Sequence, residues 1–479
     1  MKKATVFFTL ALAALILFVS CGEDPFFHIV KVVNGDKTTE TIVRNGDEYT
    51  LPENDSEGFQ GWKVNDEESL RKPGEKITIK KDTTVKAVFP GDDDAPVVIR
   101  MTYVLRDFEG NFEGEFKDDS VQTVIEDVEK VTLLKESDLN IPTGASFDGW
   151  YTEEDKDGNR AYYKGGEEIT ITGDTKVYAH WTDNNLSYTV SEGDNPIVTV
   201  AAKVKDAASY KISEWYQGNK VTVIGDFSSA TKLTSITLPD MIKTISDKAF
   251  DECASLTSCD LPSKLETIGF GAFDECNLTG KIVIPASVTS IGSAAFDENA
   301  NLTEVEFEEG SAITAIPSTC FKGCGLTSFP ELPASVTSLG YSCFSDNKFE
   351  TLVIPASVTE IGQYAFFNCD SLTSVEIKAE SATVISDYAF ASSDALSTVT
   401  IGSGISSIGD AAFRATHNLT VTIGSGISSI HDNAFQDCSN VTVKIMKTAT
   451  EIKSTLTNYA TKWNCSSLTI KDKNGDVVS

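Results

Sequence analysis

Histidine is scarce in this sequence, and basic residues are far fewer than acidic ones. The 479 residues include four histidines, none four residues from another and none beside a cysteine pair, so a His-based metal site or catalytic triad lacks its side chains. Lys and Arg number 40 against 71 Asp and Glu, which leaves a net charge of −31. A surface of that sign repels phosphate, which excludes nucleic acid as a partner. We therefore predict no enzyme and no cofactor, metal or catalytic site.

Long apolar runs are missing after the first twenty residues. The one such run, Ala4 to Val19, follows Lys2-Lys3 and precedes Ser20-Cys21, and it suits a signal peptide better than a membrane span. The end of this run resembles a bacterial lipobox, which implies that Cys21 is lipidated and holds the chain in the bacterial envelope, surface exposed. Residues 1–20 are then the signal peptide and 21–25 a tether. An ordinary signal peptide with a free Cys21 thiol and an uncleaved anchor remain as alternatives.

Two stretches, residues 26–90 and 100–182, repeat one another. Each has a Phe-x-Gly-Trp block, a Gly-Glu-x-Ile-Thr-Ile segment and a closing alternating strand; the blocks are Phe59-Gln60-Gly61-Trp62 and Phe147-Asp148-Gly149-Trp150. We interpret these aromatic residues as the small core of each module and not as a carbohydrate platform. The pattern resembles the Listeria–Bacteroides repeat, also called the internalin B-repeat, which implies a β-grasp-like module of bacterial surface proteins.

Acidic clusters occur in and after the linker between the two copies. Residues 91–99 contain Asp92-Asp93-Asp94 between Gly and Pro, and Asp155, Asp157 and Asn159 stand in the second copy. Oxygen ligands of this kind suit hard cations, but the spacing is not that of an EF-hand loop. We interpret both clusters as solvated turns.

Residues 230–440 are built from a repeated unit of about 23 residues. Each unit has a phenylalanine preceded by a small residue, with an aliphatic residue five positions before it. These repeat phenylalanines, 22 to 25 residues apart, are Phe250, Phe273, Phe296, Phe321, Phe344, Phe366, Phe390, Phe413 and Phe435. One unit cannot bury its apolar side alone, so the units must stack as coils with continuous Ile, Leu and Phe ladders.

We therefore predict a mainly β fold, a solenoid of about nine coils preceded by the two small modules. Residues 183–229 would form its N-terminal cap and residues 441–479 its C-terminal cap, with a helix from Thr450 to Trp463 and a strand at Ser467–Lys471.

The repeat unit resembles a known family of leucine-rich repeats. Its residues are seen in Leu352-Val353-Ile354-Pro355-Ala356-Ser357-Val358-Thr359-Glu360-Ile361-Gly362-Gln363-Tyr364-Ala365-Phe366, which are similar to the BspA-like (Treponema pallidum-type) repeat. That resemblance implies a surface protein acting as an adhesin toward host extracellular-matrix proteins or neighbouring cells. A passive structural spacer and a glycan-binding protein of the envelope are the alternatives.

Nine cysteines follow Cys21. Cys253, Cys276, Cys324, Cys369 and Cys438 lie three residues after a repeat phenylalanine, and Cys320 and Cys343 directly precede one. Their spacing follows the repeat, which argues against zinc. Since neighbouring coils place equivalent Cα atoms ~5 Å apart, Cys253–Cys276 and Cys320–Cys343 disulfides are open alternatives to the buried thiols that we expect.

The turn after the repeat phenylalanine is acidic in several coils. Its candidate partner-binding residues are Asp251, Glu252, Asp274, Glu275, Asp297, Glu298, Asp346 and Asp437, and residues 186–479 hold 34 acidic against 19 basic residues. A charge recurring at one turn of successive coils is ordinarily a solvated face. If this edge binds a partner, the partner surface is basic and the attraction weakens with salt.

Overall fold

The computed structural model describes residues 27–478 except 35–36, 45–46, 55–60, 66–70, 79–82, 89–97, 106–114, 117–122, 127–129, 157–158, 172–174, 379, 382, 457–462, 464 and 466. The predicted signal peptide, Cys21, Phe59 and most of the acidic linker lie outside these residues. The chain divides into two compact units, one of Met1–Phe108, Glu113–Ile141 and Gly149–His180 and the other of Glu109–Phe112, Pro142–Asp148 and Trp181–Ser479. Within the described residues, no helix has the length and apolar character needed to cross a membrane.

The two N-terminal modules share one strand topology. In the first, the sheet order is β2-β1-β6-β4, and in the second it is β13-β12-β15-β7-β9. The strands of the first module are β1 (Phe27–Asn34), β2 (Lys37–Arg44), β3 (Glu48–Thr50), β4 (Gly61–Val64), β5 (Lys76–Thr78) and β6 (Thr83–Val88). Those of the second are β7 (Val98–Val104), β8 (Glu115–Phe116), β9 (Thr123–Glu126), β10 (Lys130–Thr132), β11 (Leu139–Asn140), β12 (Ala145–Tyr151), β13 (Tyr162–Tyr163), β14 (Glu168–Thr170) and β15 (Thr175–Asp183), with a short 3-10 helix at Glu136–Asp138.

In each module the first strand pairs antiparallel with a neighbour (β1 with β2, β7 with β9) and parallel with the last strand (β1 with β6, β7 with β15), which confirms the internal repeat. The tryptophans of the two Phe-x-Gly-Trp blocks are buried at 1% and 0% exposure. Trp62 Nε1 donates to the Pro52 carbonyl and Trp150 Nε1 to the Leu134 carbonyl, both at 2.8 Å. Gly149 is required because a Cβ there would lie 2.5 Å from the Tyr162 ring. The tryptophans are therefore core residues of the modules, as the sequence predicted.

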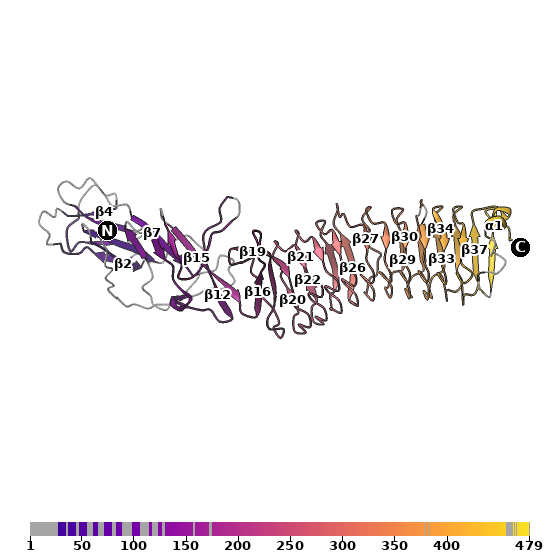
Figure 1. Cartoon of the computed structure of the whole chain (residues 1–479), viewed down its shortest axis with the longest axis horizontal. Helices are drawn as coiled ribbons and strands as arrows, with labels where there is room; N and C mark the ends of the chain where they lie inside the picture. Colours follow the sequence, from indigo (N-terminus) through magenta and orange to yellow (C-terminus); the bar gives the residue numbers. More distant parts are fainter. Residues whose placement is uncertain are drawn as a thin grey trace. The chain divides into compact units, whose positions relative to one another are not determined.

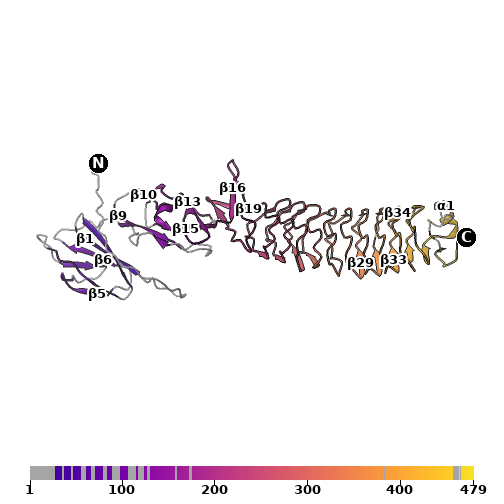
Figure 2. The same ribbon diagram turned by 90° about the horizontal axis from the view of Figure 1, so that it is seen from below.

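The second unit is a solenoid with two rows of short strands (Figures 1 and 2). The first row has β16 (Leu186–Val190), β17 (Val198–Ala202), β19 (Asn219–Ile224), β21 (Thr244–Ile245), β23 (Thr267–Ile268) and β25 (Ser290–Ile291), with β18 (Trp215–Tyr216) beside β19. It resumes with β27 (Ala315–Ile316), β28 (Ser338–Leu339), β30 (Glu360–Ile361), β32 (Thr383–Ile385), β34 (Ile405–Ile408) and β36 (Ser429–Ile430).

The second row is divided into three sheets. It contains β20 (Ser235–Ile236) with β22 (Ser258–Cys259), then β24 (Gly280–Ile284) with β26 (Leu302–Phe307), then β29 (Thr351–Ile354), β31 (Ser374–Ile377), β33 (Thr398–Ile401), β35 (Thr420–Ile423), β37 (Val441–Ile445) and β38 (Leu468–Lys471). Neighbouring coils pair in parallel, as β29 and β31 do, with apolar residues inward and polar residues outward in alternation.

A stack of aromatic rings, which we name the Phe ladder, runs through the solenoid core. It comprises Phe227, the nine repeat phenylalanines and Trp463, with neighbouring centroids 5.1 to 5.9 Å apart. The solenoid thus has about 11 turns, and our count of nine coils was too low. The coil ending at Phe227 was missed because Gly225-Asp226 precede this phenylalanine and the aliphatic Ile224 stands three residues before it. At the other end, Trp463 takes the position of a phenylalanine.

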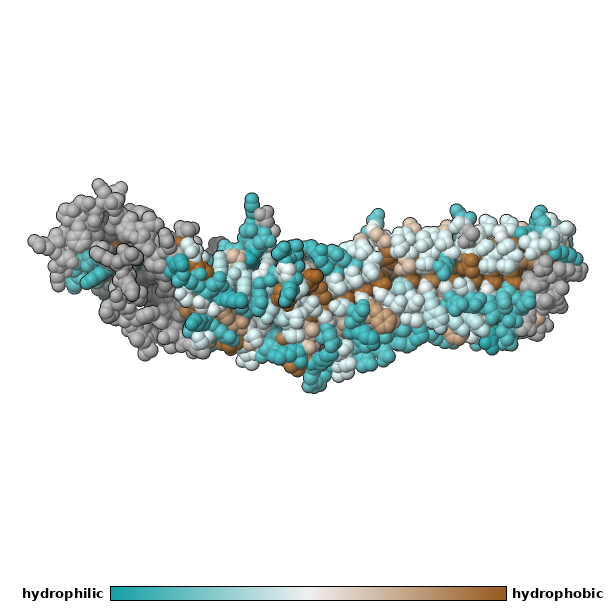
Figure 3. Space-filling view, in the orientation of Figure 1, coloured by the Kyte–Doolittle hydropathy of each residue, from teal (hydrophilic) through white to brown (hydrophobic). Residues whose placement is uncertain are grey.

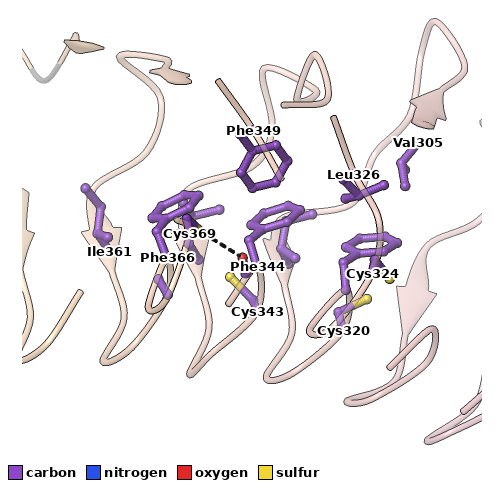
Figure 4. Close-up of a cluster of buried hydrophobic side chains, with 14 of the residues drawn as sticks. Val305, Cys320, Cys324, Leu326, Cys343, Phe344, Phe349, Ile361, Phe366 and Cys369 are labelled. Carbon is purple, nitrogen blue, oxygen red and sulfur yellow. Dashed lines mark hydrogen bonds between the residues drawn. The ribbon is translucent and has the colours of Figure 1, made fainter. Parts of the chain in front are cut away.

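In eight coils the residue three positions after the ladder phenylalanine has a structural role, which the close-up in Figure 4 illustrates at Cys369. Its side chain donates a hydrogen bond to the carbonyl of the ladder phenylalanine in the preceding coil. We name this the donor position: Cys253, Cys276, Cys324 and Cys438 donate at 2.9 to 3.3 Å, Cys369 at 3.6 Å, Ser393 at 3.4 Å, and Asn299 and Asn347 at 2.7 Å. This bond explains why small donors recur there. All nine described cysteines are buried free thiols.

The C-terminal end contains the predicted strand and, over the first part of the predicted helix, a short helix; residues 457–462 of that prediction lie outside the described residues. Helix α1 (Ala449–Thr455) begins with a capping box between Thr448 and Glu451. The helix ends at Thr455 because Leu456 leaves helical geometry (φ −106°, ψ 82°) and is buried at 1% exposure.

Candidate partner-binding surface

The acidic turn predicted from the sequence exists, and its backbone is held by hydrogen bonds between coils. The second residue of each turn has a left-handed backbone: φ is 58° at Glu252, 51° at Glu275, 56° at Glu298, 60° at Asp346 and 59° at Asp437. The N–H of Glu252 donates to the Asp274 carbonyl (2.9 Å) and that of Glu275 to the Asp297 carbonyl (3.1 Å). These turns therefore present side chains at fixed steps along one edge, which we name the turn edge.

The candidate residues divide along the turn edge. Asp251, Glu252, Asp274, Glu275, Asp297 and Glu298 lie on three adjacent coils, whereas Asp346 lies two coils beyond Phe296 and Asp437 four coils further. The structure thus brings six of the eight together. In these three pairs the first carboxylate is half-buried and the second is exposed.

Two half-buried carboxyls in this group have raised pKa values. Burial, with Asp251 and Glu275 nearby, raises the pKa of Asp274 to about 6. Burial likewise raises the pKa of Asp297 to about 6, while Lys322 acts in the opposite direction. Both side chains therefore gain protons just below neutral pH.

The turn edge also carries basic side chains, which partly neutralise it. Lys248 pairs with Asp251 at 3.0 Å, Lys322 contacts Glu298 at 2.5 Å, and the Nε of Arg414 pairs with Asp437 at 2.9 Å. Exposed pairs of this kind contribute little to stability. Glu275 has no ion-pair partner among the described residues. The edge is therefore less acidic than the sequence pattern indicated.

Three tyrosines, each shortly before the repeat phenylalanine of a later coil, were not identified as candidates from the sequence. Tyr364 and Tyr388 stack with centroids 4.9 Å apart and an interplanar angle of 8°, and Tyr341 meets Tyr364 at 5.5 Å. Tyr341 is 51% exposed. The signal was present, because an aromatic residue stands two or three positions before the repeat phenylalanine in these three consecutive coils. Tyrosine is favoured at interfaces because it offers a large contact area with few rotatable bonds.

Figure 3 shows hydrophilic side chains over much of the visible solenoid face, with a hydrophobic stripe along its C-terminal coils. The large apolar side chains that remain exposed include Val353 (44%) and Val384 (40%), both on outward positions of strands.

No group of three or more metal-ligating side chains occurs among the described residues. Asp155 accepts a hydrogen bond from the Asn159 N–H at 2.9 Å, which closes a turn. Burial raises the pKa of the Cys259 and Cys369 thiols to about 12, so these side chains stay protonated at neutral pH. Cys320 and Cys324 are likewise protonated and buried, which disfavours zinc binding.

Family models match both parts of the chain. The model described as BspA type leucine rich repeat region matches residues 222–350 and 337–464, and the Listeria-Bacteroides repeat domain matches residues 108–180. The latter match falls on the second N-terminal module.

The similar solved structures include three bacterial proteins. A leucine-rich repeat protein from Bacteroides ovatus is 19% identical, with 60% of this chain and 98% of that chain covered and a TM-score of 0.29. A leucine rich cell surface protein from Faecalibacterium prausnitzii is 22% identical (60% and 94% covered, TM-score 0.39), and the pneumococcal vaccine antigen PcpA is 19% identical (60% and 98%, TM-score 0.34). No curated protein matches the chain.

Proposed function

Because the chain belongs to the BspA-type leucine-rich repeat proteins, we propose that it is a cell-surface protein whose solenoid binds other proteins. Proteins of this family are typically found at the cell surface, and leucine-rich repeat proteins are typically binding scaffolds without enzymatic activity. The observation that carries the proposal is the turn edge, where hydrogen-bonded turns present exposed carboxylates on three coils and Tyr341, Tyr364 and Tyr388 on three later coils. Because the backbone of these turns is already fixed, a partner that binds there causes little loss of conformational entropy.

More specifically, we propose that the protein is an adhesin for host extracellular-matrix proteins or for the surface proteins of neighbouring cells. A solid-phase assay of residues 22–479 against matrix proteins and whole cells tests it. The solenoid without residues 22–185 should retain the binding. A passive spacer would bind nothing in this assay, and a glycan-binding protein would lose its cell binding after deglycosylation.

We predict that binding through the turn edge depends on salt and on pH. Raising the ionic strength from ~0.05 to ~0.5 M should weaken attraction to a basic partner about tenfold. Lowering the pH from 7.5 to 5.5 should weaken it too, because Asp274 and Asp297 have pKa values raised to about 6 and lose their negative charge in that interval. Surface plasmon resonance at each condition measures both effects.

The matched control for this prediction removes the same charge elsewhere. Replacing Glu252, Glu275 and Glu298 by Gln should weaken binding, whereas Gln at the exposed Glu360 and Glu376 with Asn at the exposed Asp394 should leave it unchanged. Equal loss in both triple variants would assign the salt effect to net charge and not to the turn edge.

We also propose that Cys21 carries the lipid that anchors the protein in the envelope. Cys21→Ser should abolish incorporation of labelled palmitate and release the protein from the membrane fraction, because acyl chains supply the anchoring free energy. Fractionation with immunoblotting measures this, with Cys465→Ser as the control for loss of a cysteine. Unchanged labelling of Cys21→Ser would contradict the anchor.

A further inference from the structure

The second strand row is interrupted between β26 and β29. The segment Thr327–Leu332 occupies this place but forms no strand. It aligns with Thr279–Ile284, which includes β24, because the two segments have the same length and each stands between a leucine and a proline. By this alignment, Pro330 takes the place of Ile282 and cannot donate a ladder hydrogen bond. Phe329 packs instead against Phe344 (5.2 Å), Phe349 and Phe366 (both 5.8 Å).

This interruption leaves one edge of β29 open. On the other edge, the Glu350 and Ile354 carbonyls accept from the N–H groups of Thr373 and Lys378, both at 2.9 Å. Successive residues of a strand direct their main-chain groups to opposite sides, so those of Thr351 and Val353 face the Thr327–Leu332 segment. Within the described part of the chain, no backbone hydrogen bond joins that segment to Thr351 or Val353.

A hollow of about 520 Å³ lies beside this open edge. Its walls are the Thr327–Leu332 segment on one side and Glu350, Thr351, Val353 and Pro355 on the other. Glu331 and Glu350 are exposed, and neither has an ion-pair partner among the described residues. Unpaired strand edges are normally paired or charged with lysine. The strand β29 contains no lysine, and among the described residues this edge of it has no backbone hydrogen-bond partner.

We propose that the open edge of β29 binds an extended basic peptide segment of a partner protein, which adds to the sheet as a further strand. The Thr351 and Val353 main-chain groups supply its hydrogen bonds, and Glu331 and Glu350 select Lys or Arg side chains. A second copy of this chain fits less well, because pairing two such edges would bring Glu331 and Glu350 toward carboxylates of the same kind. The proposal rests on the protein-binding role above and names a surface separate from the turn edge.

The test measures binding of a fluorescein-labelled peptide, acetyl-(Lys-Val)₃-amide, to the full-length protein by fluorescence anisotropy. We expect saturable binding that Val353→Pro weakens at least tenfold, because proline removes an N–H that the protein itself leaves unbonded. Val353→Ala keeps that N–H and should bind like the wild type. Circular dichroism checks the folding of both variants.

Peptide controls keep the test decisive even if Val353→Pro does not fold. A peptide with the same side chains but N-methylated at alternate residues should not bind, and an acetyl-(Glu-Val)₃-amide peptide should not bind either. Glu331→Gln with Glu350→Gln should weaken binding of the lysine peptide about tenfold.

Three outcomes overturn the proposal: no binding of the lysine peptide, equal binding of the N-methylated peptide, or a concentration-dependent dimer that Val353→Pro abolishes, which would assign the edge to a second copy. The glutamine variants of the turn edge should leave peptide binding intact. Failure of the peptide assay is therefore distinguishable from failure of the adhesin proposal, which is read from matrix binding.

Discussion

Phe344→Ala is expected to lower the free energy of unfolding of the solenoid by about 3–5 kcal/mol. The Phe344 side chain is 0% exposed and lies in the Phe ladder, 5.6 Å from Phe321 and 5.8 Å from Phe366 between ring centroids. Phe329 and Phe349 meet the same ring edge-on, so the cavity left by alanine is bounded by ordered rings that cannot collapse into it. Denaturant titration followed by circular dichroism measures the loss.

Phe270→Ala is the matched control for this prediction. Phe270 is 47% exposed and stands three residues before a ladder phenylalanine, so its truncation should change the free energy of unfolding by less than about 0.5 kcal/mol. If Phe344→Ala costs under about 1 kcal/mol, the ladder does not stabilise the stack in the way described. Because each coil contacts only its neighbours, the loss should appear as weakened cooperativity between the two halves of the solenoid.

The Phe ladder could be predicted from the sequence because each coil needs one large ring in its core, and a phenylalanine therefore recurs at a nearly fixed spacing. The sequence did not predict the coils that end at Phe227 and Trp463, because neither keeps the flanking residues by which the other coils were aligned. A ring of suitable size can stack on the ladder whatever residue carries it. Trp463 therefore lies 5.9 Å from Phe435, between ring centroids, although it breaks the sequence pattern. The interruption at Pro330 was also missed, since proline is common in these repeats and its effect depends on the strand position that it occupies.

The candidate surface was predicted only in part. The acidic residues after each ladder phenylalanine were visible in the sequence, but their partners Lys248, Lys322 and Arg414 lie in other turns or at other register positions. The pairs between coils, Lys322 with Glu298 and Arg414 with Asp437, depend on the inter-coil hydrogen bonds, which the sequence does not display. The tyrosine contacts depend on the same register, because Tyr364 and Tyr388 stack only when their coils are neighbours.

Asn347→Leu is the second substitution with a large expected effect, about 3 kcal/mol of lost stability. Asn347 is 2% exposed at a donor position. Its Nδ2 donates to the Phe321 carbonyl at 2.7 Å and to the Phe344 carbonyl at 3.1 Å, and its Oδ1 accepts from the Leu326 N–H at 3.1 Å. Leucine has nearly the same shape but satisfies none of these groups, which would stay buried without water. Denaturant titration measures the change.

The control for this substitution comes from the protein's own repeats. Cys324 and Cys369 occupy the donor position in other coils and donate Sγ to a ladder carbonyl at 3.1 and 3.6 Å. Asn347→Cys should therefore keep one hydrogen bond, lose the acceptor for Leu326, and cost about half as much as Asn347→Leu. If the cysteine and leucine variants are equally destabilised, shape and not hydrogen bonding determines which residues stand there. A smaller loss for cysteine would mean that the cysteines of this solenoid are retained as buried hydrogen-bond donors, which requires neither disulfides nor a metal.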